Sequence, residues 1–375
     1  MPNKLKILQV NKLYYPVIGG VEKVVQQIAE GLKDKTDLEV LACQDKGKTS
    51  IETINGVKVY KAGSFGRLFS MPISLSFLRL FHEKMYKNDI IHIHLPFPLA
   101  DLAVFLFRPK ARIALWWHSD IVRQKWLFFF YRPLTKWLLR RADRILVAAQ
   151  GHIDGSDFLP GFRDKCRVVP FAVDDAVLAK GTQFVQQNVS PPKNEKKPVS
   201  VLFVGRLVYY KGCEFLLRAF AQTRNANLVI VGKGALEKRL KKLAARLGLA
   251  NKVKFFPSLP AAQLDRIYAD CDIFVLPSVE KTEAFGLVQI EAMAYGKPVI
   301  NTNLPSGVPQ VSLDGISGLT VPPKDVSALA RALQRLIDED KLRRRLGQGA
   351  YRLAHTKYTM RQMLTGVMAV YQELQ

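Results

Sequence analysis

The chain has 375 residues, of which 48% are hydrophobic, and it carries a formal net charge of +24. This length and composition exclude a disordered chain and favour two globular domains. The longest strongly apolar stretch, residues 95–107, is shorter than the roughly 18–20 residues that span a bilayer, and the N-terminus lacks a signal-peptide pattern. We therefore expect a cytoplasmic protein with a polyanionic partner: nucleic acid, an anionic membrane or a phosphorylated substrate.

In the first half of the chain, short apolar segments alternate with helical patterns. Strands are expected at residues 6–10, 90–95, 112–116 and 144–148, and a helix at 21–32. This alternation is typical of a parallel, doubly wound sheet. Residues 181–199 interrupt it, because they are rich in Gln, Asn, Pro and Lys, and we expect an interdomain linker there.

The alternation restarts after this segment. Strands are expected at residues 199–204, 227–231, 272–276 and 299–301, and helices at 213–222, 236–247, 286–295 and 327–338. The second half is therefore predicted to be a second doubly wound sheet. Two such sheets facing each other would leave a cleft at the carboxyl ends of their strands, where ligands of open α/β folds bind.

The most informative motif spans residues 278–294, where a strand ends and a helix starts near Phe285 or Gly286. Amides at a helix start bind phosphate or sugar oxygens, and a glycine permits close approach. Glu283 precedes the helix and Glu291 follows about two turns later, so both carboxylates can face one ligand and accept hydrogen bonds from sugar hydroxyls. A helix cap at Glu283 and a solvated Glu291 are the structural alternative.

A basic loop, residues 205–212, follows another predicted strand. Arg206 and Lys211 would stabilise the negative charge that develops on a leaving diphosphate. Ordinary loop cations are the alternative.

Two further motifs are weaker. Gly19 and Gly20 at the start of the first helix would let a ligand approach the backbone, although a plain turn explains them equally well. His118 follows a strand and would donate a hydrogen bond to a sugar or phosphate, unless it is satisfied structurally. His92 and His94 share one face of a strand, but without an evident third metal ligand we favour pocket lining or packing. We likewise reject a metal site at Asp270-Cys271-Asp272.

The motifs GGVE (19–22), HSD (118–120), GRLVYYKG (205–212), VGKG (231–234) and EAFGLVQIE (283–291), in this order and spacing, resemble the retaining glycosyltransferases of family 4. The stretch 296–323 is similar to bacterial mannosyltransferases of surface-polysaccharide assembly. The resemblance covers nearly the whole chain. It implies the α/β fold named GT-B, with two doubly wound Rossmann-like domains facing a cleft. We expect an N-terminal acceptor-side domain at 1–185, a linker at 186–198, a nucleotide-sugar-binding domain at 199–356, and a C-terminal helix at about 357–375 packing back on the first domain.

The resemblance also implies roles for the motif residues. Arg206 and Lys211 would hold the diphosphate, Glu283 would contact the donor sugar, and Glu291 would bind the ribose. The remaining implied donor-site residues offer backbone or polar contacts to the diphosphate or sugar: Gly20, His118, Gly232, Phe285, Gly286 and Leu287.

The implied activity is metal-independent, retaining transfer of a hexose to a lipid-linked saccharide in O-antigen, exopolysaccharide or lipopolysaccharide biosynthesis. GDP-mannose is the favoured donor, a UDP-sugar is an alternative, and no cofactor is expected. A nucleotide-sugar epimerase on the same fold is the competing enzyme. The basic composition also suggests a nucleic-acid binder, but no nucleic-acid motif is present and the ordered motifs would then be unexplained.

An acceptor-side surface is expected in residues 104–144, which contain ten basic and two acidic side chains. Trp126, Phe130 and Trp137 recur at helical spacing, flanked by cations that include Arg140 and Arg141. Basic and aromatic side chains together suit an anionic membrane surface, so we expect a peripheral protein at the inner face of the cell membrane. The alternative is that the aromatic rings belong to the domain core.

Overall fold

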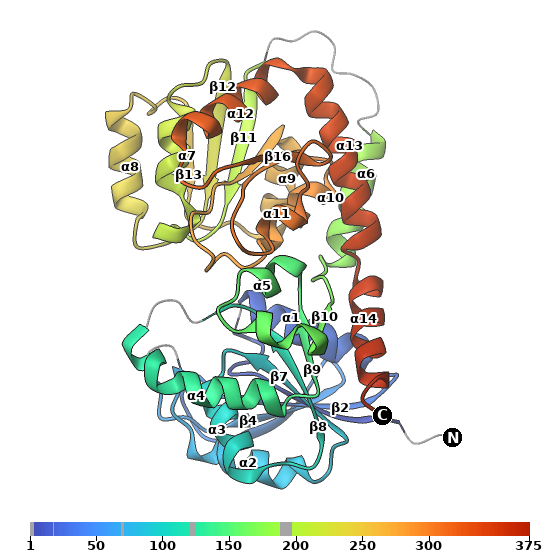
Figure 1. Ribbon diagram of the computed structural model, residues 1–375. Coiled ribbons are helices and arrows are strands. Elements are labelled where there is room, and N and C mark those ends of the chain that lie inside the picture. The colour runs from blue at the N-terminus through green and yellow to red at the C-terminus, as the bar shows by residue number, and fades with distance from the viewer. Residues whose placement is uncertain (1–3, 18, 69–70, 121–124, 188–196) are drawn as a thin grey trace. The chain divides into compact units, whose positions relative to one another are not determined.

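The computed structural model describes residues 4–17, 19–68, 71–120, 125–187 and 197–375, with no side-chain description over 125–130. It divides into two compact units (Figure 1). The first comprises Met1–Phe171 together with Met360–Gln375, and the second comprises Ala172–Thr359.

The first unit is built on an eight-stranded sheet with the order β10-β9-β8-β7-β1-β2-β4-β3. Its strands pair in parallel, except that β3 runs antiparallel to β4. The strands are β1 Lys6–Val10, β2 Asp37–Cys43, β3 Ser50–Ile54, β4 Val57–Ala62, β7 Ile90–Leu95, β8 Arg112–Trp117, β9 Arg144–Val147 and β10 Cys166–Val168. A separate small hairpin pairs β5 Arg67–Leu68 with β6 Met71–Pro72.

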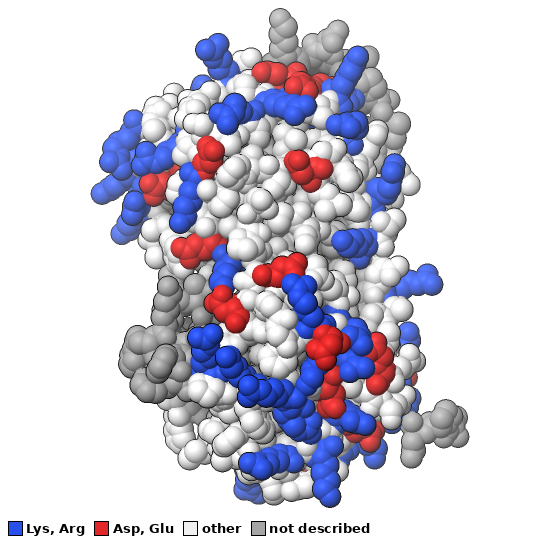
Figure 2. All heavy atoms as spheres, viewed as in Figure 1, with Lys and Arg blue, Asp and Glu red and all other residues white. Residues whose placement is uncertain are grey.

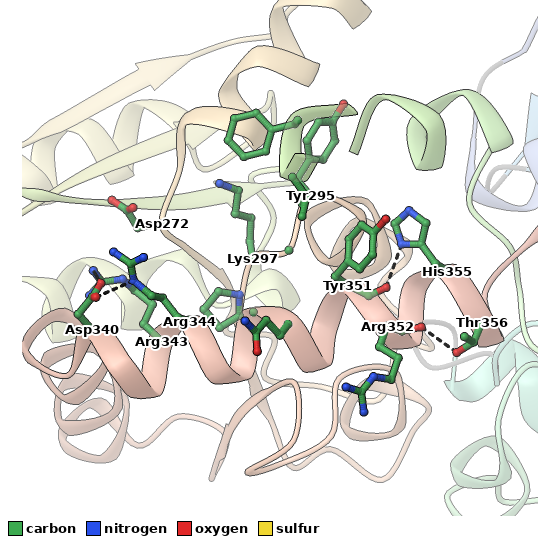
Figure 3. Close-up of a pocket in the computed structure, with 16 residues that line it drawn as sticks. Asp272, Tyr295, Lys297, Asp340, Arg343, Arg344, Tyr351, Arg352, His355 and Thr356 are labelled. Carbon is green, nitrogen blue, oxygen red and sulfur yellow. Dashed lines mark hydrogen bonds and ion pairs between the residues drawn. The ribbon is translucent and has the colours of Figure 1, made fainter. Parts of the chain in front are cut away.

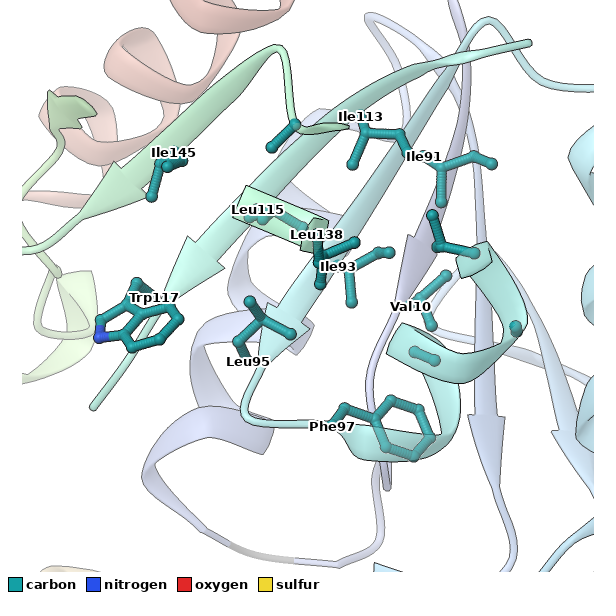
Figure 4. Packing of buried hydrophobic residues seen from close by; sticks show 14 of the residues in the cluster. Val10, Ile91, Ile93, Leu95, Phe97, Ile113, Leu115, Trp117, Leu138 and Ile145 are labelled. Carbon is teal, nitrogen blue, oxygen red and sulfur yellow. The ribbon is translucent and has the colours of Figure 1, made fainter. Parts of the chain in front are cut away.

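The helices of the first unit are α1 Gly20–Leu32, α2 Leu75–Met85, α3 Pro98–Phe107, α4 Lys125–Arg141, α5 Gln150–Asp154 and α14 Met360–Gln372, with a 3-10 segment at Leu159–Lys165. Pro133 lies inside α4 without dividing it. One face of the sheet packs its apolar side chains, such as Ile93 and Leu115, against α2, α3 and α4 (Figure 4). The other face carries a row of polar and aromatic residues, including Gln9, His94 and Trp116, because successive side chains of a strand point to opposite faces.

The second unit has a six-stranded, wholly parallel sheet with the order β13-β12-β11-β14-β15-β16. The strands are β11 Val199–Val204, β12 Ala226–Val231, β13 Val253–Phe256, β14 Ile273–Leu276, β15 Val299–Thr302 and β16 Gly318–Val321. Counted along this unit, the order is 3-2-1-4-5-6, the doubly wound arrangement of dinucleotide-binding domains. The connections reverse direction between β11 and β14, and ligands of such sheets bind at the carboxyl ends of the strands beside this reversal.

The helices of the second unit are α6 Asp175–Gln187, α7 Cys213–Phe220, α8 Glu237–Arg246, α9 Ala261–Asp270, α10 Leu287–Ala294, α11 Val308–Val311, α12 Val326–Asp338 and α13 Asp340–Lys357. Of the helices described, none is long and apolar enough to cross a membrane.

The expected start of the linker is wrong. Residues 181–187 belong to α6, and the division between units falls after Phe171, not after residue 185. Gly181 lets α6 pack closely on α10, because a Cβ at this position would lie 2.2 Å from the carbonyl oxygen of Ala294. This contact accounts for helical structure in a segment that the sequence predicted to be a linker. The polar composition of the segment concealed this contact. Residues 188–196 lie outside the described part of the chain.

Candidate functional site

The site in the second unit starts from two loops that follow the adjacent strands β11 and β14. The first loop ends in a 3-10 turn, Tyr209–Lys211, and Gly212 then takes a left-handed conformation with φ of 69°. A Cβ at Gly212 would lie 1.8 Å from the carbonyl oxygen of Pro277, and the amide of Val279 donates to the carbonyl of Tyr210 at 2.8 Å. Glycine is therefore required for the two loops to touch, and this contact fixes the position of Lys211.

Lys211 and Glu283 form a buried ion pair across these loops. The Nζ of Lys211 lies 2.6 Å from Oε2 of Glu283, and the two side chains are 11% and 9% exposed. The hydroxyl of Ser278 donates to the same carboxylate oxygen at 3.2 Å. The structure thus brings together two residues that the sequence placed in one site, and Glu283 is an ion-pair partner and not a helix cap.

Arg206 lies in the same loop and is exposed. Its Nη2 donates to the hydroxyl of Tyr210 at 2.6 Å, and its guanidinium carbon lies 5.9 Å from the centre of that ring. The ammonium of Lys211 also lies 5.9 Å from the centre of the Tyr210 ring. One tyrosine therefore contacts both predicted diphosphate cations and holds them near each other. Tyr210 and Ser278 were not predicted as site residues, although both lie inside the motifs selected from the sequence.

Helix α10 supplies the rest of the predicted donor site. Gly286 precedes its first residue, Leu287, and has φ of 76°; a Cβ there would lie 2.4 Å from the Leu276 side chain. Phe285 is buried and packs edge-on against Tyr358, with ring centres 6.1 Å apart. Gly286 therefore lets the chain turn tightly from β14 into the helix, which begins four residues after Glu283.

Glu291 is half-buried on α10, and its Oε2 accepts a hydrogen bond of 2.8 Å from the hydroxyl of Tyr268. Burial, and then the negative charge of Glu291, raise the pKa of Tyr268 well above its usual value, so this tyrosine stays a neutral donor. Glu291 is consequently held in place through one carboxylate oxygen, unlike a freely solvated side chain.

Gly232 follows β12 and has a structural reason to be glycine. Its φ is 150°, and a Cβ would lie 1.9 Å from the carbonyl oxygen of Gly205, in the loop after β11. The two loops approach as closely as their backbones allow, which brings the Gly232 backbone beside the loop that carries Arg206.

The predicted donor-site residues of the first unit lie at its own strand ends and at the start of α1. Gly20 begins α1, is exposed, and a Cβ there would meet no atom within 4 Å. Among the described residues, no packing contact explains this glycine. His118 follows β8 and is buried, with its Nε2 2.9 Å from Nδ1 of His94.

His92 and His94 lie in the interior of the first unit, where each makes a side-chain hydrogen bond. The Nδ1 of His92 lies 2.7 Å from the hydroxyl of Tyr371 on α14. Burial lowers the pKa of His92 to about 3. No group of three His, Cys, Asp or Glu side chains suited to a metal ion occurs within the part of the chain that the structure describes.

The residues predicted to contact a membrane do not form one exposed surface, because some of them pack inward. Trp137 packs against the apolar core of the first unit and meets the Phe105 ring edge-on, with centres 5.0 Å apart. Arg141 is anchored, because its Nη2 donates to the carbonyl of Pro109 at 2.7 Å and to that of Ala111 at 3.1 Å. Arg140 is exposed. The side chains of Trp126 and Phe130 lie outside the described residues.

A cavity of about 760 Å³ opens elsewhere in the second unit (Figure 3). It is lined from α13 by Arg343, Arg344 and Tyr351, and by Asp272 and Pro298, which directly precede β14 and β15. It therefore lies at the amino ends of the strands, the opposite edge of the sheet from Lys211 and Glu283. None of the predicted donor-site residues lines it.

The comparisons with known proteins agree with this geometry. The family model described as glycosyltransferase family 4 matches residues 18–177, and the model described as glycosyl transferases group 1 matches residues 185–353. The O-antigen chain mannosyltransferase C of Escherichia coli is 30% identical over 372 residues, which cover 99% of each chain. The chain belongs to glycosyltransferase family 4.

Other relatives of this family 4 glycosyltransferase include the D-rhamnosyltransferase WbpZ of Pseudomonas aeruginosa, 32% identical over 92% of this chain and 90% of the relative. Among solved structures, a sucrose-phosphate synthase from Thermosynechococcus elongatus superposes with a TM-score of 0.78 at 21% identity and covers 99% of both chains. The apo lipopolysaccharide outer core galactosyltransferase WaaB superposes with a TM-score of 0.72 at 19% identity, over 98% of this chain and 100% of the other. The family 4 enzyme thus has the expected GT-B fold.

Proposed function

We propose that this glycosyltransferase moves a hexose, with mannose as the first candidate, from a nucleoside diphosphate to a lipid-linked saccharide of a surface polysaccharide such as O-antigen. The observation that carries the proposal is the Lys211–Glu283 pair beside Arg206, at the point where the connections of the second sheet reverse. The named activities of the E. coli and P. aeruginosa relatives support a hexose or deoxyhexose donor and an O-antigen product.

The proposed chemistry follows from these charges. The bond between the anomeric carbon and the β-phosphate oxygen breaks, and negative charge grows on the leaving diphosphate. Arg206 and Lys211 stabilise that charge, while Glu283 accepts hydrogen bonds from the sugar and Glu291 from the ribose. The acceptor hydroxyl forms the new glycosidic bond on the same face of the sugar, and its proton passes to an oxygen of the leaving phosphate. The reaction retains the anomeric configuration and uses no metal ion.

The donor is tested by thermal shift with GDP, UDP and ADP, followed by nucleotide-release assays with the matching sugars. A ligand that binds the folded state at about 100 times its Kd stabilises it by about 2.7 kcal/mol. We expect GDP to give the largest shift and GDP-mannose to release GDP when a lipid-linked acceptor is present, with or without EDTA. Release of an altered sugar without acceptor would support the epimerase instead.

We also propose that the first unit docks on an anionic membrane, through α3 and α4. Three large apolar side chains on α3 are exposed: Leu102 at 38%, Phe105 at 39% and Leu106 at 53%. The exposed cations Arg132, Lys136 and Arg140 recur every fourth residue along α4, which packs beside α3. Lys and Arg side chains form a band over α4 (Figure 2). Apolar side chains beside a basic stripe favour the interface of an anionic leaflet.

Vesicle sedimentation tests this surface. Each cation near an anionic leaflet contributes about 1 kcal/mol, so the double variant Lys136→Ala, Arg140→Ala should bind phosphatidylglycerol vesicles about 30-fold more weakly. The matched control is Lys238→Ala, Lys242→Ala, an exposed pair with the same spacing on α8 of the second unit. Equal binding to phosphatidylcholine and phosphatidylglycerol vesicles would contradict the proposal.

A further inference from the structure

A chain of hydrogen-bonded side chains reaches His118 through the interior of the first unit. Gln9 lies on β1, His94 on the neighbouring β7, and His118 directly after β8, the next strand. The Nε2 of Gln9 lies 2.9 Å from Nε2 of His94, and Nδ1 of His94 lies 2.9 Å from Nε2 of His118. The exposed fractions of the three residues are 0%, 1% and 6%, so bulk water does not compete for these contacts.

The imidazoles of His94 and His118, which belong to this hydrogen-bonded series, are neutral at ordinary pH. Burial lowers the pKa of His94 and of His118 well below the usual value, and the neighbouring histidines lower both further. A neutral imidazole has one N–H donor and one acceptor nitrogen. Every ring in the chain must therefore donate on one side and accept on the other.

The amide of Gln9 sets the direction of the whole chain. In this structure the amide nitrogen of Gln9 faces Nε2 of His94, and its Oε1 is buried without a hydrogen-bond partner among the described residues. An amide nitrogen donates and does not accept, so with this amide orientation Nε2 of His94 is the acceptor. His94 then carries its proton on Nδ1 and donates it to Nε2 of His118. His118 is left with its own proton on Nδ1, and this nitrogen has no hydrogen-bond partner among the described residues.

The ring plane of His118 is fixed as well. It lies nearly parallel to Trp116, at 12° with centres 5.9 Å apart, and to Phe171, at 14° with centres 5.4 Å apart. The stacking fixes the plane of the His118 ring, and the hydrogen bond from His94 sets its tautomer. Recognition of a single ligand oxygen requires both.

We propose that Gln9 and His94 are positioning residues that lock His118 as the Nδ1–H tautomer, so that it offers a neutral hydrogen-bond donor to an oxygen of the donor sugar. The inference rests on the proposed function and on the sugar contact that the family resemblance implies for His118. A neutral N–H of this kind orients the sugar and keeps its proton; the acceptor proton still leaves with the phosphate.

The variant Gln9→Glu tests the direction of the chain. A carboxylate accepts and does not donate, so His94 would carry its proton on Nε2, and His118 would turn into the Nε2–H tautomer with an accepting Nδ1. Nitrogen NMR of histidine-labelled protein distinguishes the two tautomers. We expect His118 as Nδ1–H in the unmodified enzyme and as Nε2–H in Gln9→Glu, with kcat reduced roughly 10- to 100-fold and KM nearly unchanged.

Two more variants complete the test. Gln9→Leu keeps the side-chain size and removes the donor; we expect mixed tautomers of His118 and a smaller loss of kcat, and this variant serves if Gln9→Glu does not fold. Tyr371→Phe removes the hydrogen bond to His92 on the same face and should leave both the tautomer and kcat unchanged.

The inference is overturned if His118 is Nε2–H in the unmodified enzyme. It is also overturned if the tautomer of His118 is the same in the Gln9 variants as in the unmodified enzyme, or if the tautomer reverses without any loss of kcat. Reversal of the tautomer in a protein that consumes no nucleotide sugar would refute the proposed function and support the hydrogen-bond chain.

Discussion

The two units differ in whether the buried polar side chains near the carboxyl ends of their strands are charged or neutral. In the second unit the groups are ionic: Lys211 pairs with Glu283, and Arg206 lies in the same loop with an exposed side chain. In the first unit the buried rings of His94 and His118 are neutral, because burial lowers the pKa of each one. One Rossmann-like sheet can therefore serve charge stabilisation while its relative in the same chain serves uncharged hydrogen bonding. The topology fixes where the groups stand, and an oppositely charged partner decides whether a buried group is charged.

The largest loss of activity is expected from a change to the Lys211–Glu283 ion pair. Lys211→Ala removes the ammonium that we propose stabilises the leaving diphosphate, and loss of one such group costs roughly 100- to 1,000-fold in kcat. It also leaves Glu283 buried without its cation, so the melting temperature should fall. Lys180→Ala is the matched control, because its pair with Asp265 is half exposed at the lysine. Turnover of Lys211→Ala within about threefold of the unmodified enzyme would remove the basis for the ionic role.

Gly212→Ala should be the next most damaging change. A left-handed alanine costs about 1–2 kcal/mol, and relieving its clash with the Pro277 carbonyl costs roughly 1–3 kcal/mol more. Because Gly212 follows Lys211 directly, turnover should fall together with stability. Gly248→Ala separates the two costs, since Gly248 has φ of 71° but a Cβ there would meet no atom within 4 Å. Urea unfolding of the Gly212→Ala and Gly248→Ala variants measures the difference between their free energies of unfolding. Equal destabilisation would show that the contact between the Gly212 loop and Pro277 is unimportant.

The buried neutral histidines should make the first unit less stable to unfolding as the pH falls. The folded-state pKa is lowered, to about 3 for His92 and about 4 for His152, so the unfolded chain binds more protons below pH 6.5. Stability is therefore complete above that pH and is lost on acidification, by up to about 1.4 kcal/mol per pH unit for each histidine. All four tryptophans lie in the first unit, so urea unfolding followed by tryptophan fluorescence at pH 7, 6 and 5 reports on it.

A first unit whose unfolding free energy is constant from pH 7 to pH 5 would contradict the neutral assignment of the buried histidines.

The smallest effect is expected at Glu373, which pairs with Arg144 at 2.7 Å and with Arg167 at 2.9 Å. All three side chains are at least 30% exposed, so solvent screens the pairs and Glu373→Gln should cost about 1 kcal/mol or less. Thermal unfolding measures this cost. A loss of several kcal/mol would mean that surface charges hold α14, in place of its buried Tyr371.

Much of the fold and of the ionic site could be predicted from the sequence, because local patterns encode them. The apolar runs at β1, β7 and β11 end where expected, and the motifs at Arg206, Lys211 and Glu283 stand directly after strands. The Lys211–Glu283 contact joins two such motifs at neighbouring strand ends, so the topology rule was sufficient to bring them together.

What the sequence could not provide were contacts between distant residues that follow no periodic pattern. Gln9 and His94 are 85 residues apart, and nothing local marks the amide and the ring as partners. The inward packing of Trp137 and the bonds from Arg141 to the Pro109 and Ala111 carbonyls depend on how α4 settles against its neighbours. An amphipathic helix of mixed basic and aromatic residues leaves both orientations open.

The membership of α14 in the first unit has a consequence for biosynthesis. Tyr371 buries its ring beside His92, so this unit lacks one of its interior side chains until residues 360–375 leave the ribosome. Domains generally fold in order of synthesis, but here the second unit can finish first while the earlier one waits. Nascent chains stalled before residue 360 should therefore expose an unfinished amino-terminal half to chaperones and proteases.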